Sequence, residues 1–499
     1  MRTIFGAGVI ALVSATALAA QAPEPWTADQ DRADMMRQLG ITALVPGPSG
    51  DERAPNHANV DESAAGPVGA LPDPLTLKDG RKVADAKSWF GKRRPEILED
   101  YEREVYGRVP ADLPPVRWKV VASDRELVGF STPVIARRLV GHVQDMTDPA
   151  RSVDIRAMEV LPANAKGPVP VLIMFGFGAN AWPEPSQPTP AEYDRINDAM
   201  KALLIKQDPG LAAVFDAHQA FVFAAPPGFH FPQRDANGDL PPTDQLLAAG
   251  WGYVALDPTS AQADNGAGLR SGIIGLGNHG APRKPGDWGA LRAWAWAASR
   301  ILDYLSTDPA VDARKVGIEG VSRYGKAALV TMAFDPRFAV GLIGSSGKGG
   351  GTLLRRNFGE SIANLTTGEY YWFAGNFLKY NTKGVSKPNL DAYDLPVDSN
   401  ELFALAAPRP LFISHGVPEQ GDAHWIDQNG AWKAAYDAGR VYKLLGKTGV
   451  GVAGPADMPP PSTMVDGTLA WRQHTGGHTD VPNFRYFIPW ANRELGVGR

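Results

Sequence analysis

Residues 315–330 read KVGIEGVSRYGKAALV. The first six form a short apolar run of the kind that predicts a strand buried on both faces, and the last eight predict a helix. Ser322 therefore stands in a tight turn, which needs small neighbours because its backbone is strained and the flanking chain packs closely. The turn places Ser322 at a helix N-terminus, where the N–H groups and the dipole favour developing negative charge. We interpret Ser322 as a nucleophile.

The small residues around Ser322 differ by one place from G-x-S-x-G, the common form of such a turn. Gly320 holds the first glycine position, but Tyr324 occupies the second, and the second glycine follows at Gly325. A Gly-x-Ser triplet by itself is typical of any bend between a strand and a helix. Its place directly after an apolar strand and before a helix is what favours the nucleophile interpretation.

Working outward from this turn, three more apolar runs predict buried strands, at residues 168–175, 252–256 and 409–414. Residues 288–305 predict a helix, because their large apolar side chains recur near one helical face. Strands that alternate with helices predict an α/β fold. We expect an α/β-hydrolase, with a doubly wound, mostly parallel sheet and helices on both faces. Further strands are predicted earlier in the chain, at residues 117–121, 134–140 and 153–161.

A serine nucleophile needs a base, and the chain order in this fold is Ser, acid, His. Four histidines follow Ser322, namely His415, His424, His474 and His478. His478 lies in a glycine-containing loop near the C-terminus, where the base of this fold normally lies, and is the predicted base. His474 is the nearest competitor, and its alternative interpretation is a solvated or substrate-facing residue.

The acid that orients the base is expected in the loop after the strand at residues 409–414. This loop offers Glu419, Asp422 and Asp427. A loop rich in acidic residues is often simply solvated, so the loop alone leaves several assignments open. We predict Asp422 as the acid, with Glu419 as the alternative.

The composition excludes several classes of function. The 499 residues are 44% hydrophobic and 21% charged, and the formal net charge of −4 comes without a basic stripe, so nucleic acid is not an expected partner. Cysteine is absent, which excludes a disulfide framework, a thiol nucleophile and a Cys-based zinc site. His415, His424 and the nearby acids lack an H-E-x-x-H or comparable spacing, so we expect neither a metal nor another cofactor.

The N-terminus resembles a secretory signal peptide. Arg2 precedes an apolar run that extends to about residue 18, and small residues follow at Ala19 and Ala20. We expect residues 1–20 to be removed and the chain to be secreted or periplasmic. No later segment is apolar enough to predict a membrane anchor.

Changes in amino-acid composition along the chain predict how it is divided into domains. Residues 21–115 are punctuated by proline and glycine and are expected to form an N-terminal extension that wraps the catalytic domain. Residues 116–499 are expected to form that catalytic domain. Within it, residues 179–247 and 446–467 have the character of surface insertions.

Residues 320–326, GVSRYGK, resemble the G-C-S-R-x-G-K signature of the glucuronoyl esterases, carbohydrate esterase family fifteen, with Val321 in place of Cys. Residues 287–300 resemble the helix that precedes the nucleophile strand in this family. Three segments between residues 71 and 108 resemble the N-terminal extension of its bacterial members. The resemblance spans most of residues 70–490, and the seven-residue signature is its most specific part.

The resemblance implies hydrolysis of esters between lignin alcohols and the 4-O-methyl-glucuronic acid side groups of xylan. The expected partner is then glucuronoxylan or a lignin–carbohydrate ester, and the expected state is a monomer. Arg323 would stabilise the oxyanion through its backbone N–H and guanidinium, as a fixed cation beside developing negative charge can. By the same resemblance Lys326 would contact sugar hydroxyls, Glu360 would bind the sugar, and Trp425 would line the sugar site, where an indole face can stack.

One segment departs from the family pattern. Many members carry the triad acid in E-S-G-x-G-G, whereas residues 345–350 read SSGKGG, with Ser345 in the place of the acid. Other bacterial members hold an acid in the loop before the tryptophan, which by resemblance favours Asp422 or Glu419. Two alternatives to a glucuronoyl esterase remain open here. One is an acetylxylan or other carbohydrate esterase on the same scaffold, and the other is a carbohydrate-binding homologue with impaired catalysis.

Overall fold

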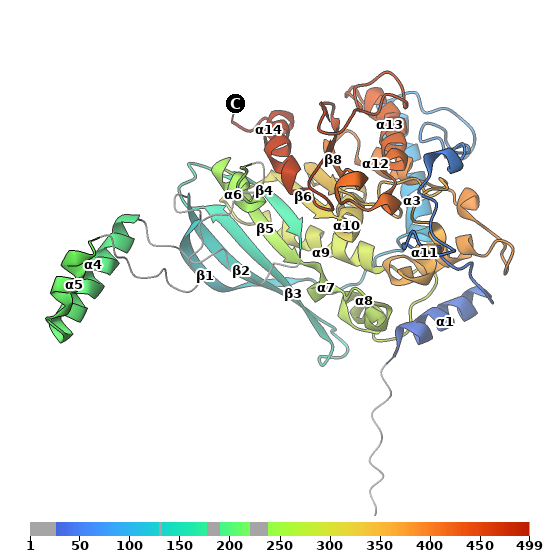
Figure 1. The fold of residues 1–499 in the computed structure, drawn as a ribbon. Coiled ribbons are helices and arrows are strands. Elements are labelled where there is room, and N and C mark those ends of the chain that lie inside the picture. The colour runs from blue at the N-terminus through green and yellow to red at the C-terminus, as the bar shows by residue number, and fades with distance from the viewer. Residues whose placement is uncertain (1–25, 129–131, 177–189, 220–237, 499) are drawn as a thin grey trace, which may run out of the picture.

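The computed structural model describes residues 26–128, 132–176, 190–219 and 238–498. In these residues a ten-stranded sheet has the order β1-β2-β3-β5-β4-β6-β7-β8-β10-β9. Strands from β5 to β10 in this order pair in parallel, and β1–β3 and β9 are added antiparallel at the two edges. The structure thus has the doubly wound, mostly parallel sheet that the sequence predicts (Figure 1).

The strands are β1 (Arg117–Val128), β2 (Thr132–Gln144), β3 (Ser152–Pro162), β4 (Val169–Phe175), β5 (Gly252–Asp257), β6 (Val311–Val321), β7 (Val340–Gly344), β8 (Leu411–Gly416), β9 (Met464–Val465) and β10 (Leu469–His474). The α-helices are α1 (Ala28–Leu39), α2 (Ala86–Ser88), α3 (Arg94–Glu104), α4 (Pro190–Gln207), α5 (Leu211–Ala217), α6 (Pro242–Ala248), α7 (Pro258–Ala261), α8 (Gly272–Gly277), α9 (Ala290–Leu305), α10 (Arg323–Phe334), α11 (Ile362–Thr367), α12 (Ser399–Ala406), α13 (Gln428–Leu444) and α14 (Phe484–Leu495). Short 3₁₀ or π turns named below are η2 (Trp89–Arg93), η3 (Gly266–Arg270), η4 (Tyr370–Trp372), η7 (Pro418–Gln420) and η8 (His424–Ile426).

The predicted buried strands correspond to β4, β5, β6 and β8, and the predicted helix at residues 288–305 corresponds to α9. Sequence reasoning did not identify β7 and β10. The strand β10 is buried along its whole length although Arg472, Gln473 and His474 interrupt its apolar character. Two of these polar side chains have buried partners, since Arg472 donates to Asn483 Oδ1 at 2.5 Å and His474 Nε2 lies 2.6 Å from Thr479 O.

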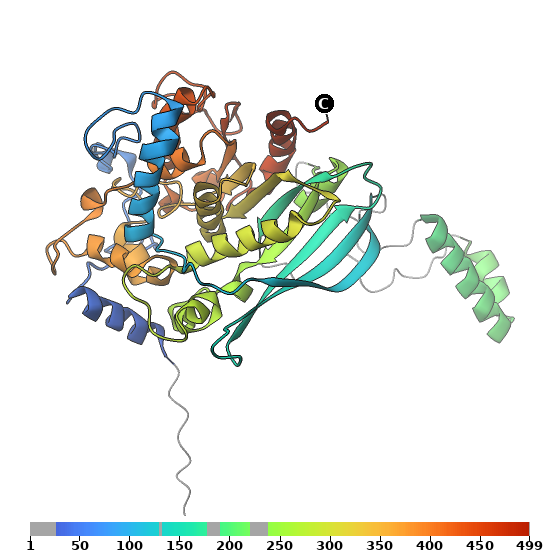
Figure 2. The ribbon, with the colours of Figure 1, turned by 180° about the vertical axis from the view of Figure 1, so that it is seen from behind.

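Helices cover both faces of the sheet, and alternate strand residues point to opposite faces. In β4, Val171 and Ile173 belong to the core beneath α9 and α10, whereas Leu172 belongs to the core beneath α6 and α14. Figures 1 and 2 show α9 along one face and α14 on the other. This layering leaves the carboxyl ends of the parallel strands as the edge where loops meet.

One sequence expectation about the surface insertions is wrong. The end of the segment at residues 179–247 forms α6, whose Leu246 and Leu247 are buried in the core beneath α14. These leucines pack in the same buried cluster as Phe484 and Trp490. This part of the segment is therefore a helix that covers the sheet, and not a surface insertion. The earlier described part forms α4 and α5, and residues 179–189 and 220–237 lie outside the described residues, as does the expected signal peptide at residues 1–20.

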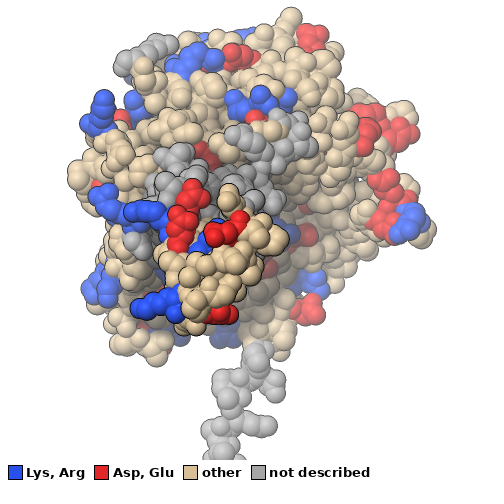
Figure 3. Space-filling model, turned by 60° about the vertical axis from the view of Figure 1, so that its left-hand side comes forward, with Lys and Arg blue, Asp and Glu red and all other residues tan. Residues whose placement is uncertain are grey.

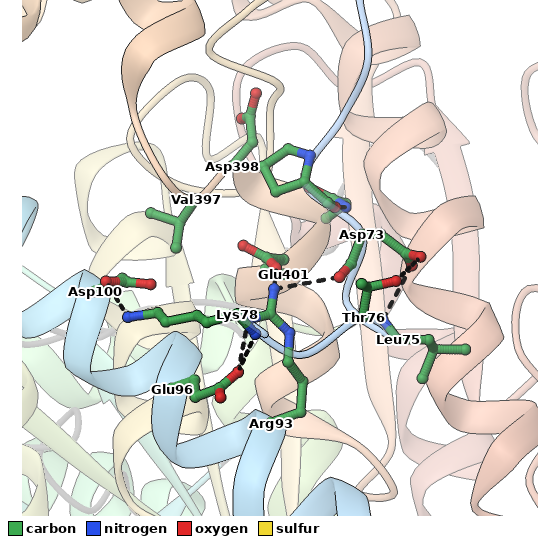
Figure 4. Close-up of polar contacts among 12 residues, drawn as sticks. Asp73, Leu75, Thr76, Lys78, Arg93, Glu96, Asp100, Val397, Asp398 and Glu401 are labelled. Carbon is green, nitrogen blue, oxygen red and sulfur yellow. Dashed lines mark hydrogen bonds and ion pairs between the residues drawn. The ribbon is translucent and has the colours of Figure 1, made fainter. Parts of the chain in front are cut away.

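The described part of the N-terminal segment shares its core with the rest of the chain. Trp89 and Tyr101 are buried in the same cluster as α9 and α10, and the Tyr101 hydroxyl donates to the backbone oxygen of Asp398 at 2.8 Å. In Figure 4, Arg93 of η2 reaches Glu401 of α12, and its Nη2 lies 2.5 Å from Glu401 Oε1. Both side chains are less than a tenth exposed. This buried ion pair therefore joins the N-terminal segment to α12. The division of the chain into an extension and a catalytic domain stays a prediction.

The face of the molecule shown in Figure 3 carries Lys and Arg as well as Asp and Glu side chains, scattered among other residues. None of the helices in the described ranges is long and apolar enough to cross a membrane.

Replacing Arg93 by Met is expected to lower the free energy of unfolding by about 3–5 kcal/mol, because the Glu401 carboxylate would be left buried without its partner. The double variant Arg93→Met/Glu401→Gln is the matched control and is expected to recover much of the loss. Denaturant titration of both variants checks this. A single variant as stable as wild type would contradict the assigned role of the pair.

Candidate active site

The turn after β6 holds Ser322 in a strained backbone conformation, with φ +60° and ψ −128°. A Cβ on Gly320 would collide with the backbone oxygen of Tyr324, and a Cβ on Gly325 would collide with that of Gly344 in β7. Both neighbours must therefore be glycine for α10 to pack this closely on the sheet. The position directly before Gly325 can carry the larger Tyr324, whose buried ring stacks on Phe175 at 6.2 Å between centroids. This packing explains why the second glycine comes one place late.

The turn from Gly320 to Gly325, called the elbow below, also supplies backbone donors. The Ser322 N–H donates to Gly344 O at 2.9 Å, which fixes the turn against β7. Arg323 is the first residue of α10, so its N–H has no acceptor within the helix and is available to a bound group. The N-terminal end of α10 adds a partial positive charge at the same place. The elbow is therefore suited to hold an oxyanion formed at Ser322.

The predicted base and acid meet in the structure. His478 Nδ1 lies 2.6 Å from Asp422 Oδ1, and the Asp422 side chain is fully buried. Asp422 also accepts hydrogen bonds from the backbone N–H groups of Gly416 and Ala423, each at 2.9 Å. Burial acts to raise the pKa of Asp422, but the His478 hydrogen bond and the other donors outweigh it and lower this pKa to about 2. Asp422 is thus ionised at neutral pH and can hold the imidazole in one orientation.

Ser345 supports Asp422 from the position where many relatives carry an acid. Its hydroxyl donates to Asp422 Oδ2 at 2.8 Å, and its backbone N–H donates to Ser414 O at the end of β8. Ser345 has a φ of +35°, unusual for a residue with a side chain, which turns the chain at the end of β7 toward the acid loop. The hydroxyl that replaces the expected Glu is therefore a hydrogen-bond donor to the acid on the other loop.

The alternative acids lie elsewhere. Glu419 is exposed on η7 and lines a cavity of about 360 Å³ together with His424 and Met458. Asp427 caps α13 by accepting from the Gly430 N–H at 2.8 Å and forms an ion pair with Arg356. Neither contact involves His478. Of the acids considered in this loop, the structure brings only Asp422 to the base.

The expectation that His474 is solvated or faces the substrate is wrong. His474 is 1% exposed, its Nε2 lies 2.6 Å from Thr479 O, and its Nδ1 accepts from the Gly476 N–H at 3.1 Å. Both ring nitrogens are thus used within the loop that carries His478. His474 shapes this loop because its two hydrogen bonds tie the start of the loop to its end.

Close backbone contacts bring the His478 loop to the edge where Ser322 lies. A Cβ on Gly416 at the end of β8 would collide with Gly477 O, next to His478. A Cβ on Gly344, at the end of β7 and beside the elbow, would touch the Asp480 side chain. Within the described residues no hydrogen bond joins the Ser322 hydroxyl to His478, and in free hydrolases such contacts often tighten only around substrate. The His478 side chain is about a third exposed and so open to solvent on that side.

The residues expected to bind sugar gather beside the elbow. Lys326 lies one turn after Ser322 in α10, and its Nζ donates to Ser346 O at 2.8 Å and lies 3.5 Å from Glu360 Oε2. The Glu360 N–H donates to Trp425 O at 2.9 Å, and a Cβ on Gly359 would collide with the Trp425 backbone. Lys326 and Glu360 thus form a polar wall beside the elbow, and the backbone of Trp425 is joined to the backbone of Glu360.

Two further residues of the site were not found from the sequence. The Trp372 ring lies over both cations, with its centroid 5.2 Å from Arg323 Cζ and 5.5 Å from Lys326 Nζ. Asp264 pairs with the Arg323 guanidinium at 2.5 Å. Both stand in segments without a recognisable motif, far in sequence from the elbow, so no local pattern could have identified them. In the stretches that the structure describes, no group of three or more His, Asp or Glu residues is arranged to hold a metal ion.

Comparison with known proteins places this geometry in a family. Residues 283–446 match the family model described as glucuronyl esterase, fungi. The solved structure of a CE15 glucuronoyl esterase from Teredinibacter turnerae is 39% identical with a TM-score of 0.76, over 94% of this chain and 100% of that one. A glucuronoyl esterase from Solibacter usitatus is 31% identical with a TM-score of 0.67, over 87% of this chain and 100% of that one. A curated carbohydrate esterase from an unknown prokaryotic organism is 28% identical, over 92% of this chain and 98% of that protein.

The fungal relatives match a smaller part of the chain. A 4-O-methyl-glucuronoyl methylesterase from Phanerochaete chrysosporium is 28% identical over 55% of this chain and 56% of its own length. The bacterial structures, by contrast, are covered from end to end and share the fold. This chain therefore belongs to carbohydrate esterase family fifteen, the glucuronoyl esterases.

Proposed function

We propose that this protein hydrolyses esters of 4-O-methyl-glucuronic acid side groups of xylan with lignin alcohols, with Ser322 as nucleophile, His478 as base and Asp422 as the orienting acid. The main support is the 2.6 Å contact between His478 and the buried Asp422, held at the sheet edge where the elbow presents Ser322. Fungal relatives named 4-O-methyl-glucuronoyl methylesterase support the same chemistry. No cofactor takes part in this reaction.

In the first half of the reaction, Ser322 Oγ attacks the ester carbonyl carbon while His478 Nε2 takes the hydroxyl proton. The carbonyl oxygen becomes an oxyanion, which the Arg323 N–H and guanidinium stabilise. Asp422 stabilises the imidazolium that has formed. The C–O bond to the alcohol then breaks, and the His478 proton passes to the departing alkoxide, which leaves an acyl-Ser322 ester.

In the second half, a water molecule attacks the acyl carbon and His478 takes one of its protons. A second oxyanion forms in the same place and collapses as the bond to Ser322 Oγ breaks. The proton on His478 returns to Ser322. The products are the alcohol and the free uronic acid, and the enzyme is restored.

The wall beside the elbow favours a sugar on the acyl side of the ester. In a glucuronate ester the carbonyl carbon is a ring substituent, so the sugar ring and its hydroxyls lie next to the nucleophile. Lys326 follows Ser322 by one helical turn and pairs with Glu360, whose backbone N–H donates to Trp425 O. An acetyl ester presents only a methyl group there, which offers no hydroxyl to the remaining hydrogen-bonding positions of the Lys326 ammonium and the Glu360 carboxylate. The wall thus supports a uronate ester over an acetyl ester.

A substrate panel tests this preference. The kcat/KM for a methyl ester of 4-O-methyl-glucuronate is expected to exceed that for acetylated xylan by roughly 10⁴-fold, because sites built to hydrogen-bond a substrate reject analogues that lack the groups. The matched control is Ser322→Ala, expected to retain only the roughly 10³–10⁴-fold catalysis over water that binding and the oxyanion site supply. Faster turnover of acetylated xylan would assign the chain to the acetyl esterases, and sugar binding without turnover would indicate an impaired homologue.

Asp422→Asn is expected to lower kcat on the order of 10⁴-fold, because the amide cannot hold the imidazole in the productive tautomer. The KM should change little, since Asp422 is buried behind His478. Glu419→Gln is the control three residues away and should keep wild-type kcat. Steady-state kinetics with the uronate ester distinguish the two, and a disabled Glu419→Gln beside a normal Asp422→Asn would refute the assignment.

We also propose that residues 1–20 direct export and are cleaved. The mature chain is expected to begin near Ala20 or Gln21, where small residues end the apolar run. N-terminal sequencing of protein secreted by a bacterial host would show this boundary. Met1 retained in the secreted fraction would contradict cleavage.

A further inference from the structure

The guanidinium of Arg323 is held by a carboxylate that the reaction scheme does not use. Arg323 Nη1 lies 2.5 Å from Asp264 Oδ2, and the other oxygen of Asp264 accepts from the Trp372 indole N–H at 2.7 Å. The Trp372 ring also lies against the guanidinium, 5.2 Å from Arg323 Cζ to the ring centroid. Asp264 and Trp372 together are called the Arg323 clamp below. Asp264 holds the cation by an ion pair, and Trp372 holds it by a cation–π contact.

Both parts of the clamp are anchored in the core. Trp372 is 4% exposed, and a Cβ on Gly289 at the start of α9 would collide with its backbone oxygen. Asp264 lies between α7 and η3, two residues after Gln262, which is fully buried. Gln262 is held by the Trp294 indole N–H, which donates to its backbone oxygen at 2.8 Å. The clamp is thus a fixed support and not a chance contact between two mobile side chains.

We propose that Asp264 is a positioning residue for catalysis, which holds the Arg323 guanidinium toward the oxyanion, and that Trp372 fixes Asp264 for this task. The inference rests on the proposed function. Arg323 is 42% exposed at its side chain, and an arginine on several rotatable bonds would otherwise spread over many conformations. An oxyanion donor is effective only when it is already in place as charge develops. The guanidinium has five N–H donors, so the one engaged by Asp264 leaves others for the substrate.

Asp264 has two opposing effects on Arg323. The negative charge of Asp264 partly cancels the positive charge of Arg323, and this weakens the attraction of Arg323 to an oxyanion. The hydrogen bond from Arg323 to Asp264 orients the guanidinium, and this strengthens the same attraction. Solvent reaches the half-exposed Arg323 side chain and screens its charge, so the loss from charge compensation is small. Orientation therefore dominates, and removal of the carboxylate is expected to slow the reaction.

The stability of the fold does not account for the clamp. An ion pair as exposed as that of Arg323 and Asp264 contributes only about 0.2–1 kcal/mol. A role confined to stability would thus leave kcat unchanged when the pair is broken. A positioning role predicts the reverse, a large change in kcat with little change in melting temperature.

The first test is Asp264→Asn, which keeps an acceptor for Trp372 but removes the charge that grips Arg323. With the methyl ester of 4-O-methyl-glucuronate, kcat is expected to fall about 10–100-fold, less than the 10²–10³-fold that a lost oxyanion donor costs. The KM and the melting temperature should stay near wild type. Asp335→Asn is the matched control, because Asp335 forms an ion pair with Arg337 away from the site, and the two side chains are about as exposed as those of Asp264 and Arg323. It should keep wild-type kcat, and a wild-type kcat for Asp264→Asn overturns the proposal.

A double-mutant cycle separates positioning from general damage. In an Arg323→Met background, Asp264→Asn is expected to cause no further loss of kcat, because no guanidinium remains to be oriented. Trp372→Phe keeps an aromatic ring but removes the N–H donor together with part of the ring system, and should show a smaller fall of the same kind. An equal fold-loss with and without Arg323 overturns the proposal. Wild-type turnover of the uronate ester and its loss in Ser322→Ala test the proposed function separately, so failure of the clamp cannot be confused with failure of that function.

Discussion

The close packing of α10 against the ends of β6 and β7 is the constraint on which the site depends. Gly320 and Gly325 allow it, because any side chain at either position would collide with a backbone oxygen. The packing forces Ser322 into a strained conformation and presents its side chain above the sheet edge. It also aligns the helix N-terminus and the cations of Arg323 and Lys326 on the same side. The positions of Ser322, the Arg323 N–H and the Lys326 side chain therefore share one local origin.

The partners of Ser322 reach this edge on loops that the parallel sheet brings together. The strands β7, β8 and β10 end side by side, so Ser345, Asp422 and His478 meet although they are distant in sequence. Glycines at the strand ends let the loops approach so closely. The acid is not a lone carboxylate but is held by two backbone donors and the hydroxyl of Ser345. A serine in place of the usual acid is thus consistent with an intact relay.

The rest of the chain supports this edge from outside. The N-terminal segment shares the core of α9 and α10 and is attached to α12 by the buried pair of Arg93 and Glu401. The loop that carries Trp372 packs on the start of α9, and Trp372 in turn faces the cations of the elbow. The N-terminal segment and the loop of Trp372 therefore both pack against the helices that carry or flank the Ser322 turn.

The sequence by itself predicted the sheet with its covering helices and the strand, turn and helix around Ser322, because these depend on short-range patterns of apolar and small residues. The sequence favoured Asp422 but left Glu419 open, and only the tertiary structure separates them, since two acids three residues apart differ in which side of a turn they face. The contact between Asp264 and Arg323 was found only in the tertiary structure, because the two residues are 59 positions apart in the sequence. Local patterning specifies which element forms, whereas contacts between elements depend on how the sheet stacks them, and a single sequence carries no periodic signal for that.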